Sequence, residues 1–256
     1  MKFTSGKIDR AQRIGLYGPE GIGKSSLAAQ FEKPLFIDLE NGTDQLDVKR
    51  MSGVADWEEL IEIVQEVTKR AEMSQNPYKT LVIDTVDRAE QMAADFICRK
   101  YQQPGLESFG YGRGYTYLAE TWTELLSALD QVIQAGLNVI LIAHAKQRKI
   151  ETPDHSGTYD HWEMKLYKQI APLCKEWVDM LLFLNYQNET IGSETEGQKS
   201  LGGARLMFTS HTAYADAKNR YWLPEVMELD YGNIMYLFEK GRRGIVRMTK
   251  EGKNNG

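Results

Sequence analysis

The segment that most constrains this chain is Gly15–Phe31, GLYGPEGIGKSSLAAQF, because it contains the pattern G-x-x-x-x-G-K-[ST] from Gly18 to Ser25. A short apolar run precedes the pattern and a helix-forming run follows it. Glycines allow a tight turn whose backbone N–H groups face one centre, where Lys24 adds a positive charge and Ser25 a hydroxyl for a magnesium ion. An ordinary glycine-rich turn is the alternative. In this context the pattern favours a site for ATP and Mg²⁺ formed by Gly18, Pro19, Glu20, Gly21, Ile22, Gly23, Lys24, Ser25 and Ser26.

Length and composition are typical of a globular α/β protein. The chain has 256 residues, of which 42% are hydrophobic and 26% charged, and this suits one large domain. It contains no apolar run of membrane-spanning length and no signal-peptide core near its first residue, so we expect a cytoplasmic protein that does not bind membranes. Cys98 and Cys174 have apolar neighbours and are expected to be reduced thiols. The net charge of −5 argues against a strongly basic nucleic-acid-binding protein, so any contact with DNA must come from a local surface.

Apolar runs alternate with amphipathic segments in the first half of the chain. Strands are expected at 14–17, 34–42, 79–84 and 137–144, and helices at 56–67, 86–101 and 118–133. Asp56 is suited to cap the first of these helices, with Glu59 reaching back. A further helix is expected directly after the glycine-rich loop. This alternation predicts an α/β fold with a mostly parallel, twisted sheet between helices.

The pattern changes after residue 150. The segment 151–169 is polar and contains proline and glycine, so we expect a long loop that runs into a helix. The apolar runs 177–186 and 204–222 predict an antiparallel hairpin at the C-terminal edge of the sheet. We therefore divide the chain into a short segment at 1–12, a core at 13–240 and a basic tail at 241–256.

Three polar residues follow predicted strands and are candidates for phosphate chemistry. Asp84 ends an apolar strand where a carboxylate is suited to hold magnesium. Glu40 follows the neighbouring strand and is suited to polarise a water for attack on the terminal phosphate, although an exposed carboxylate at a turn is the alternative. His144 is either a donor that senses that phosphate or a histidine satisfied at a strand end.

The order of these elements resembles the RecA-like recombinase core, through the glycine-rich loop, FIDLE, LVID, VILIAH and KLYKQIAPLCKEWVDMLLFL. Within that superfamily the chain looks like the phage single-strand annealing ATPases of the Sak type. The resemblance covers about residues 12–240 and implies that Glu40 is the catalytic glutamate. The family usually carries glutamine where His144 stands.

The resemblance also implies contacts with single-stranded DNA through two loops, 103–116 and 147–167. Aromatic and basic residues there suit stacking on bases and contact with phosphates; the candidates are Tyr111, Arg113, Lys146, Arg148, Lys149, Trp162 and Lys165. The stretch AKNRY resembles the lysine pair with which a family member reaches its neighbour's nucleotide, which assigns Lys218 and Arg220 to a site shared between subunits. The alternative for these two residues is a pair of surface cations on an edge strand.

We therefore predict an ATP- and Mg²⁺-dependent, RecA-like ATPase that binds single-stranded DNA and promotes annealing or strand exchange of phage type. The expected partners are single-stranded DNA, further copies of the chain in a ring or filament, and, as a further candidate, a single-strand-binding protein. A small-molecule P-loop kinase is one alternative. A nucleotide-switched regulatory or loader module of the RecA superfamily is the other.

Overall fold

The computed structural model describes residues 3, 5, 6, 8, 10–151, 158–191 and 199–238. The expected basic tail, 241–256, lies outside the described residues. None of the helices within the described ranges is long and apolar enough to cross a membrane.

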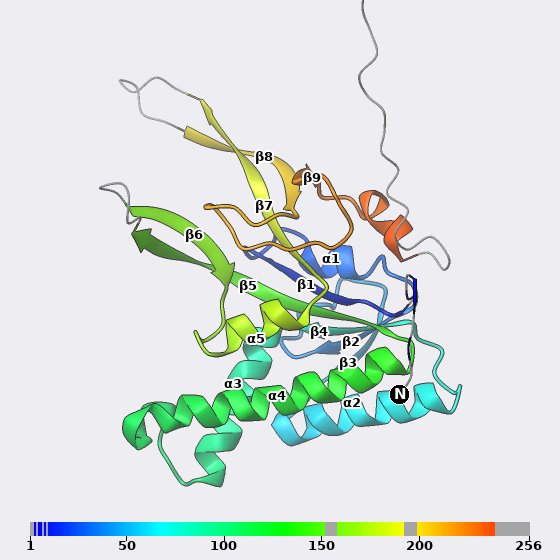
Figure 1. Cartoon of the computed structure of the whole chain (residues 1–256), viewed down its shortest axis with the longest axis vertical. Coiled ribbons are helices and arrows are strands. Elements are labelled where there is room, and N and C mark those ends of the chain that lie inside the picture. The colour runs from blue at the N-terminus through cyan, green and yellow to red at the C-terminus, as the bar shows by residue number, and fades with distance from the viewer. Residues whose placement is uncertain are drawn as a thin grey trace, which may run out of the picture.

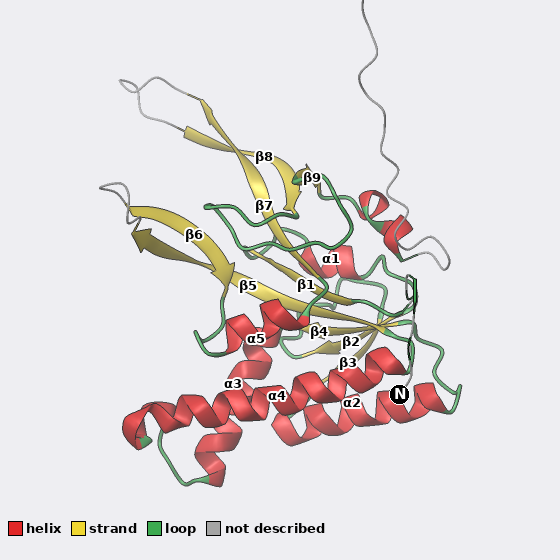
Figure 2. Cartoon of the chain, viewed as in Figure 1, coloured by secondary structure: helices red, strands yellow, loops and turns green. Residues whose placement is uncertain are grey.

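Within the described residues, one nine-stranded sheet forms the centre of the fold (Figures 1 and 2). The strand order is β3-β2-β4-β5-β1-β7-β8-β9, and β6 pairs with β5 outside this path. The strands from β3 to β7 in this order are parallel, whereas β6, β8 and β9 pair antiparallel. This confirms the predicted α/β class. The strands are β1 Arg13–Gly18, β2 Pro34–Asp38, β3 Lys49–Ser52, β4 Thr80–Asp84, β5 Asn138–Glu151, β6 Thr158–Met164, β7 Met180–Ile191, β8 Lys199–Phe208 and β9 Val226–Glu228.

Helices cover both faces of the sheet, as the uninterrupted apolar strands predict. In Figure 1, α2, α3, α4 and α5 lie on one face and α1 lies on the other. Along β1 the side chains alternate: Ile14 and Leu16 belong to the core beside α1, and Tyr17 belongs to the core beside the longer helices. The helices are α1 Lys24–Ala28, α2 Trp57–Glu72, α3 Val86–Lys100, α4 Arg113–Gln134 and α5 Ile170–Trp177.

Local signals set the ends of the helices. Asp56 caps α2 by accepting a hydrogen bond from the backbone N–H of Glu59 at 3.0 Å, and the Glu59 side chain accepts from the N–H of Ala55 at 2.7 Å. Gly136, with a φ of 93°, follows the C-terminal end of α4 in the left-handed region. The expected helix after the glycine-rich loop is short, because α1 ends at Ala28.

The segment 151–169 was expected to be a loop that runs into a helix, and this expectation is wrong for 158–164, which form strand β6; residues 152–157 lie outside the described residues. Strand β5 continues past the sheet to Glu151, and β6 runs back beside it as an antiparallel ribbon. Lys146 pairs with Glu163 in this register, with 3.5 Å between their charged atoms. The buried residues of β6, His161 and Met164, are three positions apart and do not follow the two-residue alternation that marks a strand.

Two further expectations need correction. The apolar run 204–222 is a strand only as far as Phe208. Beyond it the chain forms single bridges, Trp162 to Ala215 and Leu181 to Lys218, which place this segment between β6 and β7. Strand β3 was missed because most of its residues are exposed at the edge of the sheet, where no apolar pattern is required.

The register of the parallel strands brings the candidate site residues to one edge. Gly18 of β1 pairs with His144 of β5, and Asp38 of β2 pairs with Asp84 of β4. Since the carboxyl ends of parallel strands meet at one edge, the glycine-rich loop faces the ends of β2, β4 and the sheet part of β5.

Candidate nucleotide site

The glycine-rich loop has the backbone that phosphate binding requires. Gly21 and Gly23 have φ values of 74° and 110°, which residues with a Cβ rarely adopt. At Gly18 the constraint is close approach, because a Cβ there would lie 2.2 Å from the backbone oxygen of Leu184 on β7. Ile22 is fully buried and anchors the loop in the core. The loop is therefore held rigidly between β1, β7 and the start of α1.

Lys24 points back into this loop. Its ammonium donates to the carbonyl oxygens of Gly18 at 3.0 Å and Pro19 at 2.9 Å, and the side chain is buried. Burial lowers the pKa of Lys24, while Asp84, Asp87, Glu20 and Glu40 favour the charged form. A positive charge surrounded by carboxylates and backbone dipoles is suited to bind a polyphosphate, whose charge would compensate the cost of burial.

Ser25 and Asp84 form an oxygen pair suited to magnesium. The Ser25 hydroxyl donates to Oδ2 of Asp84 at 2.6 Å. Burial raises the pKa of Asp84 to about 6, against the hydrogen bond from Ser25. A hydroxyl and a carboxylate this close provide hard oxygen ligands of the kind that Mg²⁺ prefers together with water and phosphate. The residues present thus fit the ion that the sequence predicts.

Glu40 is held at the edge of this site by two neighbouring features. Its backbone lies in a turn that the buried carboxylate of Asp38 organises by accepting from the N–H groups of Glu40, Gly42 and Thr43 and from the Thr43 hydroxyl. Its side chain accepts a hydrogen bond from the Thr85 hydroxyl at 2.9 Å. Burial raises the pKa of Asp38, but these hydrogen bonds outweigh it and hold the pKa below its ordinary value. The turn therefore fixes where the Glu40 carboxylate points.

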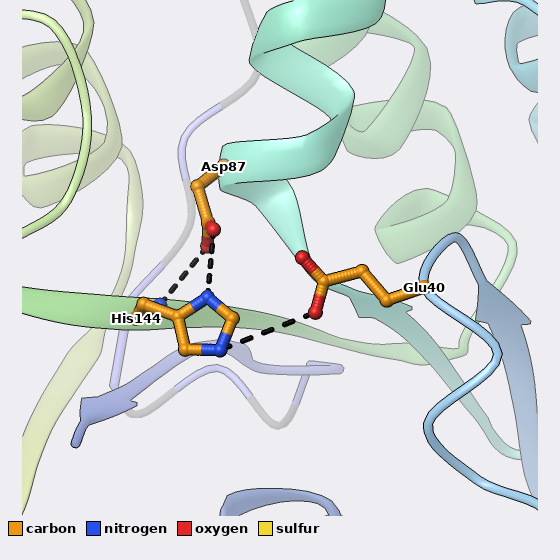
Figure 3. A group of neighbouring side chains, drawn as sticks. All are labelled: Glu40, Asp87 and His144. Carbon is orange, nitrogen blue, oxygen red and sulfur yellow. Dashed lines mark hydrogen bonds and ion pairs between the residues drawn. The ribbon is translucent and has the colours of Figure 1, made fainter. Parts of the chain in front are cut away.

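His144 meets Asp87, a residue that the sequence reasoning did not select (Figure 3). Asp87 accepts from the backbone N–H of His144 at 3.0 Å and lies 2.7 Å from its Nδ1. The Nε2 atom of the same ring faces Oε2 of Glu40 at 4.0 Å. The hydrogen bond to Asp87 raises the pKa of His144; burial and Lys24 oppose this and Glu40 adds to it.

The side chains of Glu40, Asp87 and His144 lie close enough together to be compared with a metal site, because one ligand atom of each lies within 4.8 Å of the others. Both carboxylate oxygens of Asp87 are hydrogen-bonded to His144, so we interpret the group as a hydrogen-bonded cluster rather than a metal site.

These residues line a cavity of about 370 Å³. Its walls include loop residues, Asp84, Glu40, Thr85 and His144, so the predicted loop, metal and water-polarising residues share one space. A larger hollow of about 900 Å³, beside Arg13 and Asn138 at the opposite end of β1 and β5, contains none of these residues. Chemistry rather than size therefore identifies the site.

Lys218 and Arg220 lie far from this cavity. The Lys218 ammonium donates to the carbonyl oxygens of Lys175, Glu176 and Val178, at 2.9, 3.1 and 2.6 Å, and so caps the C-terminal end of α5. Arg220 donates to Oδ1 of Asp179 at 3.0 Å, next to the start of β1. Burial lowers the pKa of Lys218. Their role toward a neighbouring subunit stays a prediction.

The residues assigned to DNA occupy two segments. Tyr111 is fully exposed with a φ of 57°, and Arg113 begins α4, so the first predicted loop is shorter than expected. Lys146, Arg148 and Lys149 lie on the β5 extension, where Lys146 and Arg148 share Glu163 at 3.5 and 3.3 Å. Trp162 packs on Phe183 with ring centroids 5.6 Å apart, and the Lys165 N–H donates to the carbonyl of His144 at 2.8 Å. Their contact with DNA also stays a prediction.

Comparisons with known proteins relate the chain to one family and to two individual proteins. A family model described as an AAA domain matches residues 10–221. The SPbeta prophage-derived uncharacterized protein YorG of Bacillus subtilis (strain 168) is 28% identical over 150 residues, which make up 58% of this chain and 44% of that protein. The match thus spans less than half the length of this relative. A KaiC-like protein of the archaeon Pyrococcus horikoshii OT3 aligns over 79% of this chain and 80% of its own, with a TM-score of 0.45 and 15% identity.

Proposed function

From the premise that the chain belongs to the AAA domain family and is a P-loop ATPase, we propose that it couples ATP hydrolysis to the binding of single-stranded DNA in annealing or strand exchange of phage type. The observation that carries this proposal is the continuity of β5. His144 at the nucleotide site and the basic residues Lys146 and Arg148 belong to one strand. The prophage origin of a relative is consistent with a phage context.

Hydrolysis follows from the groups that converge on the cavity. Lys24 binds the outer phosphates, and Ser25 and Asp84 would hold magnesium, which neutralises phosphate charge when it is bound. Thr85 occupies one carboxylate oxygen of Glu40. The other oxygen is then available to orient a water and accept its proton as the water attacks the terminal phosphate. His144 is placed to donate a hydrogen bond to the oxygens that gain charge.

The link to DNA is mechanical, through the ribbon β5–β6. Lys165 at the end of this ribbon donates its N–H to the His144 carbonyl, and the Lys146 ammonium donates to the Leu166 carbonyl at 2.6 Å. A shift of His144 on contact with the terminal phosphate would therefore be transmitted to both strands at the base of the ribbon. In Figure 1 the ribbon projects beyond α5, away from the part of the sheet that the helices cover.

The two predicted DNA segments also contact one another. Tyr115 in the first turns of α4 packs against Tyr167, just after β6, with ring centroids 5.4 Å apart. Tyr111 and Arg113, close to Tyr115 in the sequence, and Lys165, close to Tyr167, are all exposed. This supports one composite surface that combines an aromatic side chain with cations, the arrangement used for single strands.

A shared site is supported by the distance of Lys218 and Arg220 from the chain's own loop. Both lie near the amino end of β1, and Arg13 and Gly18 at its two ends are about 16 Å apart. Hydrogen bonds to the end of α5 and to Asp179 hold these side chains away from the phosphate loop of their own subunit. Their place in the proposal is therefore in a neighbouring subunit, where a cation would make hydrolysis depend on assembly.

The testing experiment is steady-state ATP hydrolysis with and without single-stranded DNA, across protein concentration and salt. We expect a rate that rises more than linearly with protein, increases with DNA and loses this increase at high salt. Lys24→Ala gives the background rate. A linear rate that is indifferent to DNA would refute the coupling; turnover only with an added small acceptor would indicate the kinase, and nucleotide-dependent assembly that survives Glu40→Gln would indicate the switch module.

The subunit question needs a mixing experiment. Arg220→Ala is preferable to Lys218→Ala, because removal of Lys218 would leave three carbonyls at the end of α5 without their donor. If Arg220 acts in a neighbour, Arg220→Ala subunits mixed with Glu40→Gln subunits should recover part of the activity. Arg99→Ala is the matched control, since its side chain is 56% exposed and that of Arg220 58%. Absence of recovery at every ratio would exclude the shared site.

A further inference from the structure

The ring of His144 is held on two sides by carboxylates from different elements (Figure 3). Asp87, in the first turn of α3, contacts Nδ1, and Glu40, in the turn after β2, faces Nε2. The His144 side chain is 17% exposed and that of Asp87 is 8% exposed. The ring therefore sits in a mostly enclosed position, where a fixed hydrogen bond determines which nitrogen carries a proton.

Asp87 fixes both the backbone and the ring of His144. One carboxylate oxygen accepts from the backbone N–H at 3.0 Å and the other lies 2.7 Å from Nδ1. Because an ionised carboxylate only accepts hydrogen bonds, Nδ1 must carry a proton. Only Nε2 is then left to interact with the cavity, on the side of Glu40.

Capping of α3 does not explain this arrangement. The cap is Thr85, whose hydroxyl accepts from the backbone N–H of Arg88. Asp87 is buried, and within the described residues each of its two carboxylate oxygens is hydrogen-bonded to His144. A carboxylate that served only the start of the helix would remain exposed and would avoid the cost of burying a charge.

The charges around the ring favour a proton on both nitrogens. Asp87 on α3 and Glu40 after β2 favour the charged ring, whereas burial and Lys24 on α1 oppose it, and the resulting pKa of His144 lies above its ordinary value. Burial raises the pKa of Asp87, but its hydrogen bonds with His144 outweigh this and lower it. Both shifts stabilise an imidazolium–carboxylate pair.

Nε2 of His144 and Oε2 of Glu40 are close enough to share one bound oxygen atom. The two atoms are 4.0 Å apart. An oxygen at about 2.8 Å from each, an ordinary hydrogen-bond distance, fits beside the line that joins them. A water or a phosphate oxygen in that position would receive a hydrogen bond from Nε2 and donate to, or lie beside, the Glu40 carboxylate.

We propose that Asp87 is a positioning residue that holds His144 as a cationic donor, with Nε2–H directed at the oxygen on which Glu40 acts. The subunit then supplies its own positive group at the reacting phosphate, in addition to Lys24 and independently of Lys218 and Arg220. The inference rests on the proposed function only for its kinetic consequence. The position and charge of the ring are properties of the protein without nucleotide.

The test is a titration of the histidine rings by NMR in the nucleotide-free protein. The sequence has four histidines, so His144→Gln identifies the signal of His144. We expect a midpoint above the ordinary value of about 6.5 in the wild type, and a lower midpoint in Asp87→Asn. Asp95→Asn, the same change at an exposed position of α3, should leave the midpoint in place. A wild-type midpoint at or below the ordinary value would overturn the proposal even if Asp87→Asn failed to fold, and so would an unchanged midpoint in that variant.

The kinetic arm separates this proposal from the proposed function. Because the charged ring is the active form, kcat should fall on the alkaline side as His144 loses its proton, and Asp87→Asn should move this fall to lower pH by the same interval. His144→Gln should lower kcat and abolish the alkaline fall. A shift of the NMR midpoint without a shift of the kcat profile would overturn the catalytic role. A protein without ATP turnover would refute the proposed function, while the NMR midpoints would still decide whether Asp87 holds a cationic His144.

Discussion

Replacement of Asp38 tests how the position of Glu40 depends on the buried carboxylate that organises its turn. Asp38 is 1% exposed and accepts four hydrogen bonds from the turn that carries Glu40. In Asp38→Ala the N–H groups of Glu40 and Gly42 turn to water, because both residues are exposed. Thr43 is fully buried, so its N–H and hydroxyl lose their partner without replacement.

The expected cost follows from these two groups. A buried polar group left without a partner costs about 1–3 kcal/mol, so Asp38→Ala should lower the free energy of unfolding by about 2–6 kcal/mol. Asp38→Asn should cost less, because its amide oxygen still accepts from Thr43. The released turn misplaces Glu40, and kcat should fall by about a hundredfold, as a displacement near 1 Å is able to cause. Nucleotide affinity should change little, because Lys24 and Ser25 do not contact Asp38.

The assay is urea unfolding followed by single-turnover hydrolysis on the same preparations. Asp44→Ala in the same turn is the control, because its side chain is 75% exposed and its partner Arg50 lies 3.9 Å away, a pair worth about 0–1 kcal/mol. The folded pKa of Asp38 lies below its unfolded value, so its contribution is present above the unfolded pKa and is lost as the pH falls through the folded one. The stabilities of the wild type and Asp38→Asn should therefore converge in acid. An Asp38→Ala protein with unchanged stability and kcat would refute the reasoning.

Three further predictions use other parts of the fold. Burial raises the pKa of Glu90 from 4.5 to about 7, so its contribution to the free energy of unfolding is fully present below the unfolded pKa and is lost as the pH rises through the folded pKa. Because Gln stays neutral, the free energy of unfolding of Glu90→Gln should exceed that of the wild type by about 3 kcal/mol at pH 8. Urea unfolding measures this difference, and equal pH profiles for the two proteins would contradict it. Gly18→Ala should abolish folding or cost more than about 3 kcal/mol, because its Cβ would meet the β7 backbone at 2.2 Å, whereas Gly42→Ala has nothing within 4 Å and should be close to neutral by circular dichroism melting. Tyr111→Ala should weaken single-stranded DNA binding by about 1–3 kcal/mol in a fluorescence titration, whereas Trp222→Ala, also exposed and at a φ of 57°, should not; equal effects would remove Tyr111 from the DNA surface.

Most of the fold was predictable because its signals are local. The glycine pattern specifies a turn whose geometry depends on a few adjacent residues. Strands buried on both faces carry apolar runs, and the ends of parallel strands meet at one edge. The sequence alone therefore placed Lys24, Ser25, Asp84, Glu40 and His144 in a common region, and the structure brings them around one cavity.

The missed features depend on partners that are distant in sequence. Asp87 looks like any acidic residue at the start of a helix until β5 brings His144 against it, 57 residues later. Strand β6 has its buried residues three positions apart rather than in alternation, and its Trp162 packs on Phe183 of β7. The sequence assigns Lys218 to a neighbouring subunit's site or, alternatively, to the surface of an edge strand, and neither reading predicts the three carbonyl oxygens that the end of α5 supplies to it.

The chemistry available, and the edge of the sheet at which it collects, thus follow from local sequence, because backbone geometry and hydrophobic periodicity act over a few residues. The tertiary structure alone decided which polar groups pair: Asp38 with the turn of Glu40, Asp87 with His144, and Lys218 with α5. Such pairs form between side chains or backbone groups of separate elements, and the strength of each depends on distance and burial. Neither quantity exists until the chain has folded.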